Sequence, residues 1–228
     1  MKKYFFFDMD GTLTPSRQEI KQEMAEMLAS LRNKGNITIA ISGASREQML
    51  KQLSNSVDYI LAQSGSDTPF WQRTFDENNK KEVIDHLQKI KDFLSDQDIL
   101  GIEEDLLQDR GSQMAFSFLG HNSDLDKKRT FDPKGEFRRS LLEKFPFNSE
   151  DLECRIGGTT CLDYTYKDST KGKNIEKLLK RFGWDKNECI YYGDALFSGG
   201  NDETVLGVID AVEVLHPEDL LVKLKEYK

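Results

Sequence analysis

Apolar positions in the first third of the chain alternate between strand-like and helix-like patterns. Residues 4–7 are four aromatic residues in succession, and residues 37–41 and 59–61 are short runs of mainly apolar residues. Unbroken apolar runs of this length are typical of parallel strands that are buried on both faces. Between them, residues 17–34 and 45–53 carry apolar side chains at helical spacing. The order predicts a doubly wound parallel sheet, whose ligand site lies at the carboxyl ends of its strands.

This alternation is interrupted in the middle of the chain and then returns. Between residues 78 and 167 the pattern predicts a mixture of elements: helices at 80–94 and 134–145, a strand with apolar residues at period two around 114–118, and a strand at 161–166. A helix at 171–182, a strand at 189–192 and a helix from Pro217 follow. The predicted fold class is therefore α/β: a Rossmann-like doubly wound core, residues 1–77 and 168–228, with an inserted α+β domain, residues 78–167.

Composition and charge narrow the class of protein. The chain has 228 residues and a net charge of −8, which argues against a nucleic-acid surface. No run approaches the roughly 18 apolar residues of a membrane span, and the Met1-Lys2-Lys3 start lacks the pattern of a signal peptide. The three cysteines have no CxxC spacing, so neither a disulfide framework nor a zinc site is expected. We expect a cytoplasmic protein that binds neither nucleic acid nor membrane.

Two carboxylates, Asp8 and Asp10, directly follow the first predicted strand. They are one residue apart and share a side of the extended chain, at a position where loops often carry reactive groups. A hard divalent cation such as Mg²⁺ would hold Asp8 ionised as a nucleophile toward phosphorus. Asp10 could then carry the proton of the leaving or attacking oxygen. The alternative is an ordinary turn after a strand, because Asp and Gly are common turn residues.

Further polar residues fall where the predicted sheet would bring them to the same edge. Ser42 and Gly43 end the second strand, where a hydroxyl and backbone N–H groups could donate to a phosphoryl group. Lys171 begins the helix after the insertion and would supply a counter-charge. Asp194 and Asp202 follow the last well-marked strand and add carboxylates for a metal, and the glycines beside them, Gly193, Gly199 and Gly200, allow a close turn.

In this order, DMDGT, a strand-terminal Ser, a Lys and GDALFSGGND resemble the four motifs of the haloacid dehalogenase (HAD) superfamily of phosphatases and phosphomutases. Three longer segments are similar to its eukaryotic-type phosphomannomutase branch, whose type IIB-like α+β cap is inserted at this position: DMDGTLTPSRQEI, GGTTCLDYTYKDSTKGKNI and YYGDALFSGGNDETV. The resemblance implies that the insertion is a cap that closes over a phosphorylated small molecule.

The resemblance also assigns roles. It implies Asp8 as the nucleophile, Asp10 as the general acid and base, and Ser42 and Lys171 as phosphate ligands. The implied Mg²⁺ site consists of Asp8, the backbone carbonyl of Asp10, and Asp194, with support from Asp202.

Five residues are candidates for substrate binding. The counterpart of Arg17 helps to hold the substrate in the family, and Asp163 would face sugar hydroxyls from the cap. Arg110, followed by Gly111, matches an Arg-Gly pair of the family, and Cys161 stands where the family has a Ser. Gly43 contributes its backbone beside Ser42.

The cap departs from the family pattern at two positions where a mutase would grip the phosphate that is not reacting. Ser117 and His121 stand where binding arginines would align. Lys128 or Arg129 could replace one lost charge, or could lie in a solvated loop. Charge-assisted pairs of this kind contribute about 1.5–3 kcal/mol each, so their loss would weaken distal phosphate binding.

These observations favour a Mg²⁺-dependent phosphatase that hydrolyses a sugar phosphate through an aspartyl-phosphate. The alternative is a phosphomannomutase that interconverts mannose 1-phosphate and mannose 6-phosphate, because residues 14–18 follow that branch closely. A catalytically silent sugar-phosphate binding protein is disfavoured by the presence of both Asp8 and Asp10. An apolar outer face of the cap would support a homodimer formed through the cap.

Overall fold

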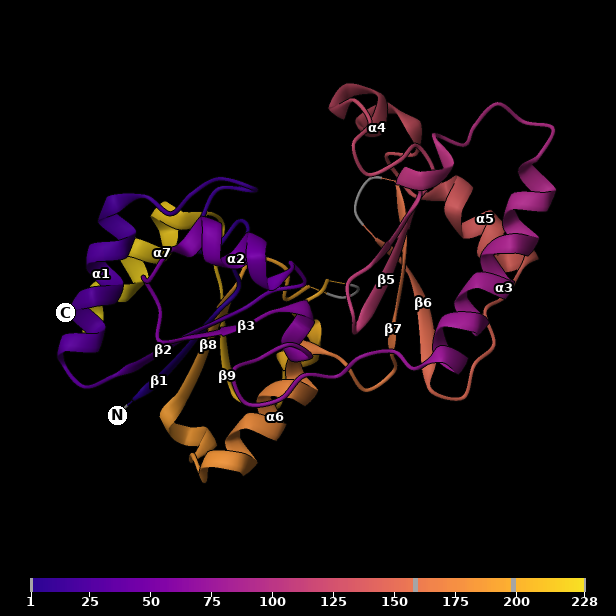
Figure 1. Cartoon of the computed structure of the whole chain (residues 1–228). Coiled ribbons are helices and arrows are strands. Elements are labelled where there is room, and N and C mark those ends of the chain that lie inside the picture. The colour runs from indigo at the N-terminus through magenta and orange to yellow at the C-terminus, as the bar shows by residue number, and fades with distance from the viewer. Residues whose placement is uncertain (1, 158–159, 198–199, 228) are drawn as a thin grey trace. The chain divides into compact units, whose positions relative to one another are not determined.

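The computed structural model describes residues 2–157, 160–197 and 200–227. The chain divides into two compact units. We call Met1–Gln72 together with Asp168–Lys228 the core unit, and Arg73–Lys167 the insertion unit. Figure 1 labels the helices and strands of the two units.

The core unit is built on a five-stranded parallel sheet in the order β3-β2-β1-β8-β9. Its strands are β1 (Tyr4–Phe7), β2 (Ile37–Ile41), β3 (Tyr59–Leu61), β8 (Cys189–Gly193) and β9 (Asp210–Glu213). Its helices are α1 (Gln22–Asn33), α2 (Arg46–Leu53), α6 (Lys171–Phe182) and α7 (Pro217–Leu224). The order of the strands and the helical crossovers confirm the predicted Rossmann-like α/β class.

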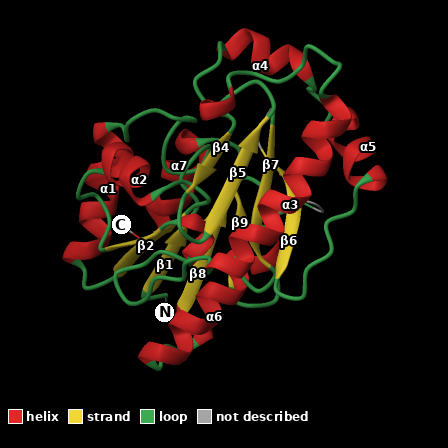
Figure 2. Ribbon diagram, turned by 45° about the vertical axis from the view of Figure 1, so that its right-hand side comes forward, coloured by secondary structure: helices red, strands yellow, loops and turns green. Residues whose placement is uncertain are grey.

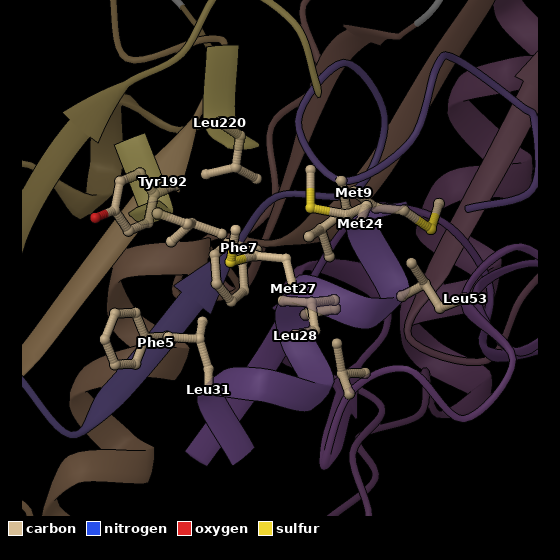
Figure 3. Close-up of a cluster of buried hydrophobic side chains, with 14 of the residues drawn as sticks. Phe5, Phe7, Met9, Met24, Met27, Leu28, Leu31, Leu53, Tyr192 and Leu220 are labelled. Atoms are coloured by element: carbon tan, nitrogen blue, oxygen red, sulfur yellow. The ribbon is translucent and has the colours of Figure 1, made fainter. Parts of the chain in front are cut away.

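The helices cover both faces of this sheet, which explains why its strands are almost entirely apolar. On one face, Phe5 and Phe7 of β1 pack with α1, α2 and α7 (Figure 3). On the other face, Phe6 packs with α6. All three phenylalanine side chains are fully buried, and burying a side chain of this size stabilises the fold by about 1.5–3 kcal/mol. The central strand is therefore a rigid base for the residues that follow it.

The insertion unit contains a four-stranded antiparallel sheet in the order β4-β5-β7-β6. Its strands are β4 (Leu107–Asp109), β5 (Gln113–Ser117), β6 (Leu152–Gly157) and β7 (Cys161–Tyr166), and its helices are α3 (Glu77–Leu94), α4 (Leu125–Phe131) and α5 (Glu136–Lys144). Helices α3 and α5 lie beside this sheet (Figure 2). Their apolar side chains belong to the same hydrophobic cluster as alternate residues of β5 and β7, including Phe116 and Leu162. The expected α+β insertion is present.

Several local predictions differ from the structure. The first helix begins at Gln22 rather than at Arg17, because residues 15–18 form a turn in which Arg17 has a positive φ of 58°. Strands β4, β6 and β9 and helix α4 were not predicted. Lys128 and Arg129 therefore lie on a helix and not in a loop.

The first boundary of the insertion unit lies after residue 72 rather than after residue 77. Phe75 belongs to the hydrophobic cluster of the insertion unit, and its N–H donates to the carbonyl of Gly111 at 2.7 Å. The segment before α3 is thus part of that unit. The second boundary lies between residues 167 and 168.

Among the described residues, no helix is both long enough and apolar enough to cross a membrane.

Candidate active site

The carboxyl ends of three neighbouring strands meet at one edge of the core sheet. In the parallel register, Phe7 of β1 stands beside Ala40 of β2 and Tyr192 of β8. Asp8, Ser42 and Asp194 follow these strands within two residues. The N–H of Asp8 donates to the carbonyl of Tyr192 at 2.9 Å, which continues the pairing one residue beyond β1.

A buried lysine joins two carboxylates at this edge. Lys171 is the first residue of α6, and Thr170 caps this helix through its side-chain oxygen. The Lys171 Nζ donates to Asp8 Oδ1 at 2.5 Å and to Asp202 Oδ1 at 2.6 Å. Lys171 is 1% exposed, Asp8 4% and Asp202 0%. Three residues far apart in the sequence therefore form one charged cluster that is shielded from water.

Asp202 is held by two further donors. The Tyr191 hydroxyl donates to Asp202 Oδ1 at 2.5 Å, and the N–H of Ala195 donates to Asp202 Oδ2 at 3.1 Å. The Asp202 N–H in turn donates to the carbonyl of Ala195 at 3.2 Å. These reciprocal bonds join the two ends of the segment between Ala195 and Asp202 and keep the Asp202 carboxylate beside Lys171.

Asp194 completes a set of three carboxylates that could hold a metal ion. Oxygen atoms of Asp8, Asp194 and Asp202 all lie within 4.8 Å of one another. Gly11 makes this approach possible, because a Cβ at Gly11 would lie 2.3 Å from Asp194 Oδ2. Gly11 also has a positive φ of 84°, which a glycine adopts without strain.

The donor set fits a hard divalent cation. All the candidate side-chain ligands are carboxylate oxygens, and opposite ligands of one Mg²⁺ are about 4.2 Å apart. Three carboxylates and one ammonium leave a net charge of −2, which one divalent cation would neutralise. The residues therefore suit Mg²⁺ after small movements of the side chains.

Burial determines the protonation of this cluster. Removal from water raises the pKa of Asp8 to about 7, although Lys171 lowers it and Asp202 raises it. The pKa of Asp194 is also raised, first by burial and then by the negative charge of Asp202. Burial opposes the charge of Lys171, but Asp8 and Asp202 outweigh it, so the pKa of Lys171 is raised. The lysine remains charged.

Asp10 has different partners from Asp8. Its Oδ1 accepts from the Arg17 N–H at 2.7 Å and from Gln52 Nε2 at 3.2 Å. Asp10 is only partly buried, and its carboxylate is not a member of the three-carboxylate set. The two aspartates of the first motif thus have separate environments, as separate chemical roles would require. Arg17 contacts Asp10 through its backbone, and its side chain is exposed.

Ser42 and Gly43 lie beside this cluster at the end of β2. Ser42 is 5% exposed, and its Oγ accepts from the N–H of Ala44 at 3.2 Å. Gly43 is partly exposed, and the nearest atom to a Cβ built on it is Ser64 Oγ at 4.0 Å. There is accordingly space beside Gly43 for an approaching ligand group.

The other three candidate residues belong to the insertion unit. Cys161 and Asp163 lie on β7 on the same face of the sheet, and Asp163 pairs with Ala115 and Arg155. Burial raises the pKa of Asp163, while Arg110 and a hydrogen bond from Gln113 lower it. Arg110 also donates to Gln108 Oε1 at 3.0 Å. These residues form a polar group within the insertion unit.

The two positions that depart from the family pattern have internal partners. The ring of His121 hydrogen-bonds to the carbonyl of Ala115 at 2.9 Å, so its Nε2 is the donor. Ser117 is fully buried, and its Oγ donates to the carbonyl of Gly120 at 3.0 Å. Both side chains contribute to the fold of the insertion unit.

Sequence reasoning did not single out Tyr191 or Gln52 as site residues. Tyr191 looks like an ordinary strand residue, and its only signal is that it shares a strand face with Gly193, directly before Asp194. Gln52 lies on the buried side of α2, where a polar residue is unusual, and this was a usable signal. Gly199 and residues 158–159 of the GGTTC segment lie outside the described residues.

Comparisons with known proteins show the family to which the chain belongs. A family model described as haloacid dehalogenase-like hydrolase matches residues 5–206. A phosphomannomutase from Encephalitozoon cuniculi is 26% identical over 99% of this chain and 93% of its own length. The phosphomannomutase of Saccharomyces cerevisiae is 26% identical over 96% of this chain and 92% of its own.

Solved structures share the fold at lower identity. A phosphatase of the same superfamily from Bacteroides thetaiotaomicron has a TM-score of 0.66 and 14% identity, and the match covers 100% of this chain and 95% of that one. An IMP-nucleotidase from Plasmodium falciparum has a TM-score of 0.65 and 14% identity, covering 98% and 66%.

Proposed function

Because the chain belongs to the haloacid dehalogenase-like hydrolase family, we propose that it transfers a phosphoryl group to Asp8 and then to water, as a phosphatase of small phosphate esters such as sugar phosphates. The observation that carries this proposal is the buried Lys171 between Asp8 and Asp202, with Asp194 beside them. Such a cluster is costly to bury and offers both a nucleophile and compensation for phosphate charge.

In the first step an oxygen of Asp8 attacks phosphorus, and the bond from phosphorus to the ester oxygen breaks. Asp10 gives its proton to the leaving alkoxide, and an aspartyl-phosphate remains on Asp8. Lys171, Ser42 and the N–H groups next to Gly43 hold the phosphoryl oxygens. Asp194, Asp8 and the Asp10 carbonyl would bind Mg²⁺, which supplies further positive charge for these oxygens.

In the second step water replaces the alcohol. Asp10 takes a proton from the water, the water oxygen bonds to phosphorus, and the bond between phosphorus and the Asp8 oxygen breaks. Inorganic phosphate leaves, and Asp8 and Asp10 return to their starting states. Partial exposure of Asp10 suits this exchange of protons with substrate and water.

A phosphomannomutase activity is the second candidate, and the curated relatives named phosphomannomutase favour it. In that reaction a sugar monophosphate, rather than water, receives the phosphoryl group. A mutase must also bind the phosphate that is not reacting. The side chains of His121 and Ser117 are bonded to carbonyl groups of their own unit, which favours the phosphatase.

One incubation tests both candidates. The protein would be mixed with Mg²⁺, mannose 1-phosphate and a catalytic amount of hexose 1,6-bisphosphate, and both inorganic phosphate and hexose 6-phosphate would be followed. Phosphate release that disappears in Asp8→Asn supports the phosphatase. Hexose 6-phosphate without free phosphate would show a mutase, and no turnover of this or other phosphate esters would contradict both.

We further propose that Arg110, Cys161 and Asp163 contribute to the choice of substrate. Cys161 and Asp163 lie on one face of β7, and Arg110 lies in the turn between β4 and β5. Asp163 is the carboxylate of this group, and Arg110 lowers its pKa. Asp163→Asn should raise the KM for a sugar phosphate more than the KM for a phosphate ester without hydroxyl groups. Equal changes for the two substrates would exclude recognition of sugar hydroxyls by Asp163.

A further inference from the structure

Tyr191 has a polar contact that its position in a buried strand does not require. It is fully buried in the middle of β8, within the hydrophobic cluster between the sheet and α6. A phenylalanine would fill the same apolar space. Instead, the hydroxyl donates to Asp202 Oδ1 at 2.5 Å and lies 3.4 Å from Lys171 Nζ, close enough to accept from it.

The three groups form a closed triangle of hydrogen bonds. Lys171 Nζ has three protons to donate, and its three acceptors are Asp8, Asp202 and the Tyr191 oxygen. Asp202 Oδ1 accepts from both Lys171 and Tyr191. Every buried donor on the ammonium group is therefore satisfied, and the ammonium has one defined position.

We propose that Tyr191 is a positioning residue of the active site: its hydroxyl fixes Asp202 and Lys171, and through them the oxygen of Asp8 that Lys171 binds. This inference rests on the proposed function of Asp8. Tyr191 does not touch the reacting atoms. It acts by limiting where Lys171 and Asp202 can lie, and outer partners of this kind typically change activity or metal affinity by about 10- to 100-fold.

The neighbouring residue offers a matched control. Tyr192 is also a buried tyrosine of β8, but it lies on the opposite face of the sheet, beside Phe7 and Leu220 (Figure 3). Its hydroxyl interacts with that of Tyr227, and its side chain belongs to a different hydrophobic cluster from that of Tyr191. Tyr192→Phe thus removes one buried hydroxyl from the same strand without touching Asp202 or Lys171.

The test compares Tyr191→Phe with Tyr192→Phe and the unchanged protein, using para-nitrophenyl phosphate and saturating Mg²⁺. We expect Tyr191→Phe to lower kcat by at least about tenfold with KM within twofold, and Tyr192→Phe to keep kcat within twofold. A kcat within twofold for Tyr191→Phe, or an equal loss in both variants, would overturn the proposal.

A second measurement separates this inference from the proposed function. The rise of Tm with Mg²⁺ concentration needs no turnover, since a bound ion stabilises the folded protein by mass action. We expect the Mg²⁺ concentration that gives half of the maximal rise to increase about tenfold in Tyr191→Phe and to stay unchanged in Tyr192→Phe. If the unchanged protein releases no phosphate, the proposed function fails, and this Tm comparison still decides the role of Tyr191. Identical Mg²⁺ responses of the two variants would then overturn it.

Discussion

Replacing Lys171 by methionine would test whether the cluster of Asp8, Lys171 and Asp202 depends on a buried positive charge. Methionine keeps the unbranched shape of the side chain and removes the ammonium group. Asp8 and Asp202 would remain, 4% and 0% exposed, without the cation that lies 2.5 Å and 2.6 Å from their oxygens. The change therefore isolates the electrostatic contribution.

The structure sets the size of the expected effect. Removing one partner of a buried ion pair typically costs about 3–5 kcal/mol, because the remaining charge is unpaired. Tyr191 and the N–H of Ala195 still bind Asp202, so we expect the free energy of unfolding to fall by about 3 kcal/mol, the lower end of this range. For a protein of this size that corresponds to a fall in Tm of about 6–12 °C.

The assay is thermal and urea unfolding without Mg²⁺, in EDTA, at pH 8 and pH 6. Burial already raises the pKa of Asp8 from the ordinary 3.8 to about 7. Between pH 3.8 and about pH 7, folding is therefore accompanied by uptake of a proton at Asp8. The contribution of Asp8 to stability is therefore present at low pH and is lost as the pH rises through about 7. Loss of Lys171 raises this pKa further, so the deficit of Lys171→Met should be larger at pH 8 than at pH 6.

Lys173→Met is the matched control on the same helix. Lys173 is 65% exposed and pairs with Glu176 at 3.2 Å, a contact that solvent screens. We expect a change of less than about 1 kcal/mol for this variant. If Lys171→Met loses no more stability than Lys173→Met, the buried ammonium does not compensate the carboxylates, and the charge balance argued for the metal site is wrong.

Three further predictions concern pH, backbone and metal. Burial lowers the pKa of His86, whose Nε2 bonds to the Phe145 carbonyl and whose Nδ1 bonds to the Tyr164 hydroxyl, each at 2.7 Å. The contribution of His86 to stability should therefore be complete above about pH 6.5 and be lost as the pH falls toward the pKa of His86 in the folded protein. We expect faster hydrogen exchange in α3 at pH 5, after correction for intrinsic exchange rates. Unchanged protection of α3 would refute this prediction. Gly11→Ala and Gly35→Ala should each lower the free energy of unfolding by about 1–2 kcal/mol, because both glycines have positive φ values. Only Gly11→Ala should weaken stabilisation by Mg²⁺, because its Cβ would collide with Asp194, whereas nothing lies within 4 Å of a Cβ at Gly35. Equal Mg²⁺ responses of the two variants would show that Asp194 moves without consequence. Mg²⁺ should raise the Tm of the unchanged protein by mass action and raise that of Asp194→Asn much less, and a Tm that does not respond in either protein would argue against a metal site at these carboxylates.

Local patterns predicted most of the core unit. Three predicted elements have the bounds that the structure gives them. They are the aromatic run at residues 4–7 (β1), the β-branched run at 37–41 (β2) and the apolar stripe at 171–182 (α6). Each pattern reflects burial of a whole strand or of one helix face, which sequence spacing records directly. Strands β4, β6 and β9 were missed because they are short or carry exposed and polar residues at alternate positions.

The start of α1 shows how a tertiary contact can override a local pattern. Residues 17–21 continue the helical spacing, yet the Asp10 carboxylate accepts from the Arg17 N–H, and the Gln52 carbonyl accepts from the Ile20 N–H at 2.8 Å. These partners are distant in the sequence. They hold a turn in which Arg17 has a positive φ of 58°, a conformation that an α-helix beginning at residue 17 could not contain.

The residue types and their order along the chain predict a phosphoryl-transfer site with Asp8, Asp10, Lys171 and Asp194, because short motifs carry that chemistry. They could not indicate that Lys171 lies between Asp8 and Asp202, that Tyr191 completes this triangle, or that Asp10 turns instead to Arg17 and Gln52. Burial and hydrogen bonding depend on which distant residues the folded sheet brings together. Only the tertiary structure decides those distances, and at low dielectric a few ångströms determine whether a charge is compensated.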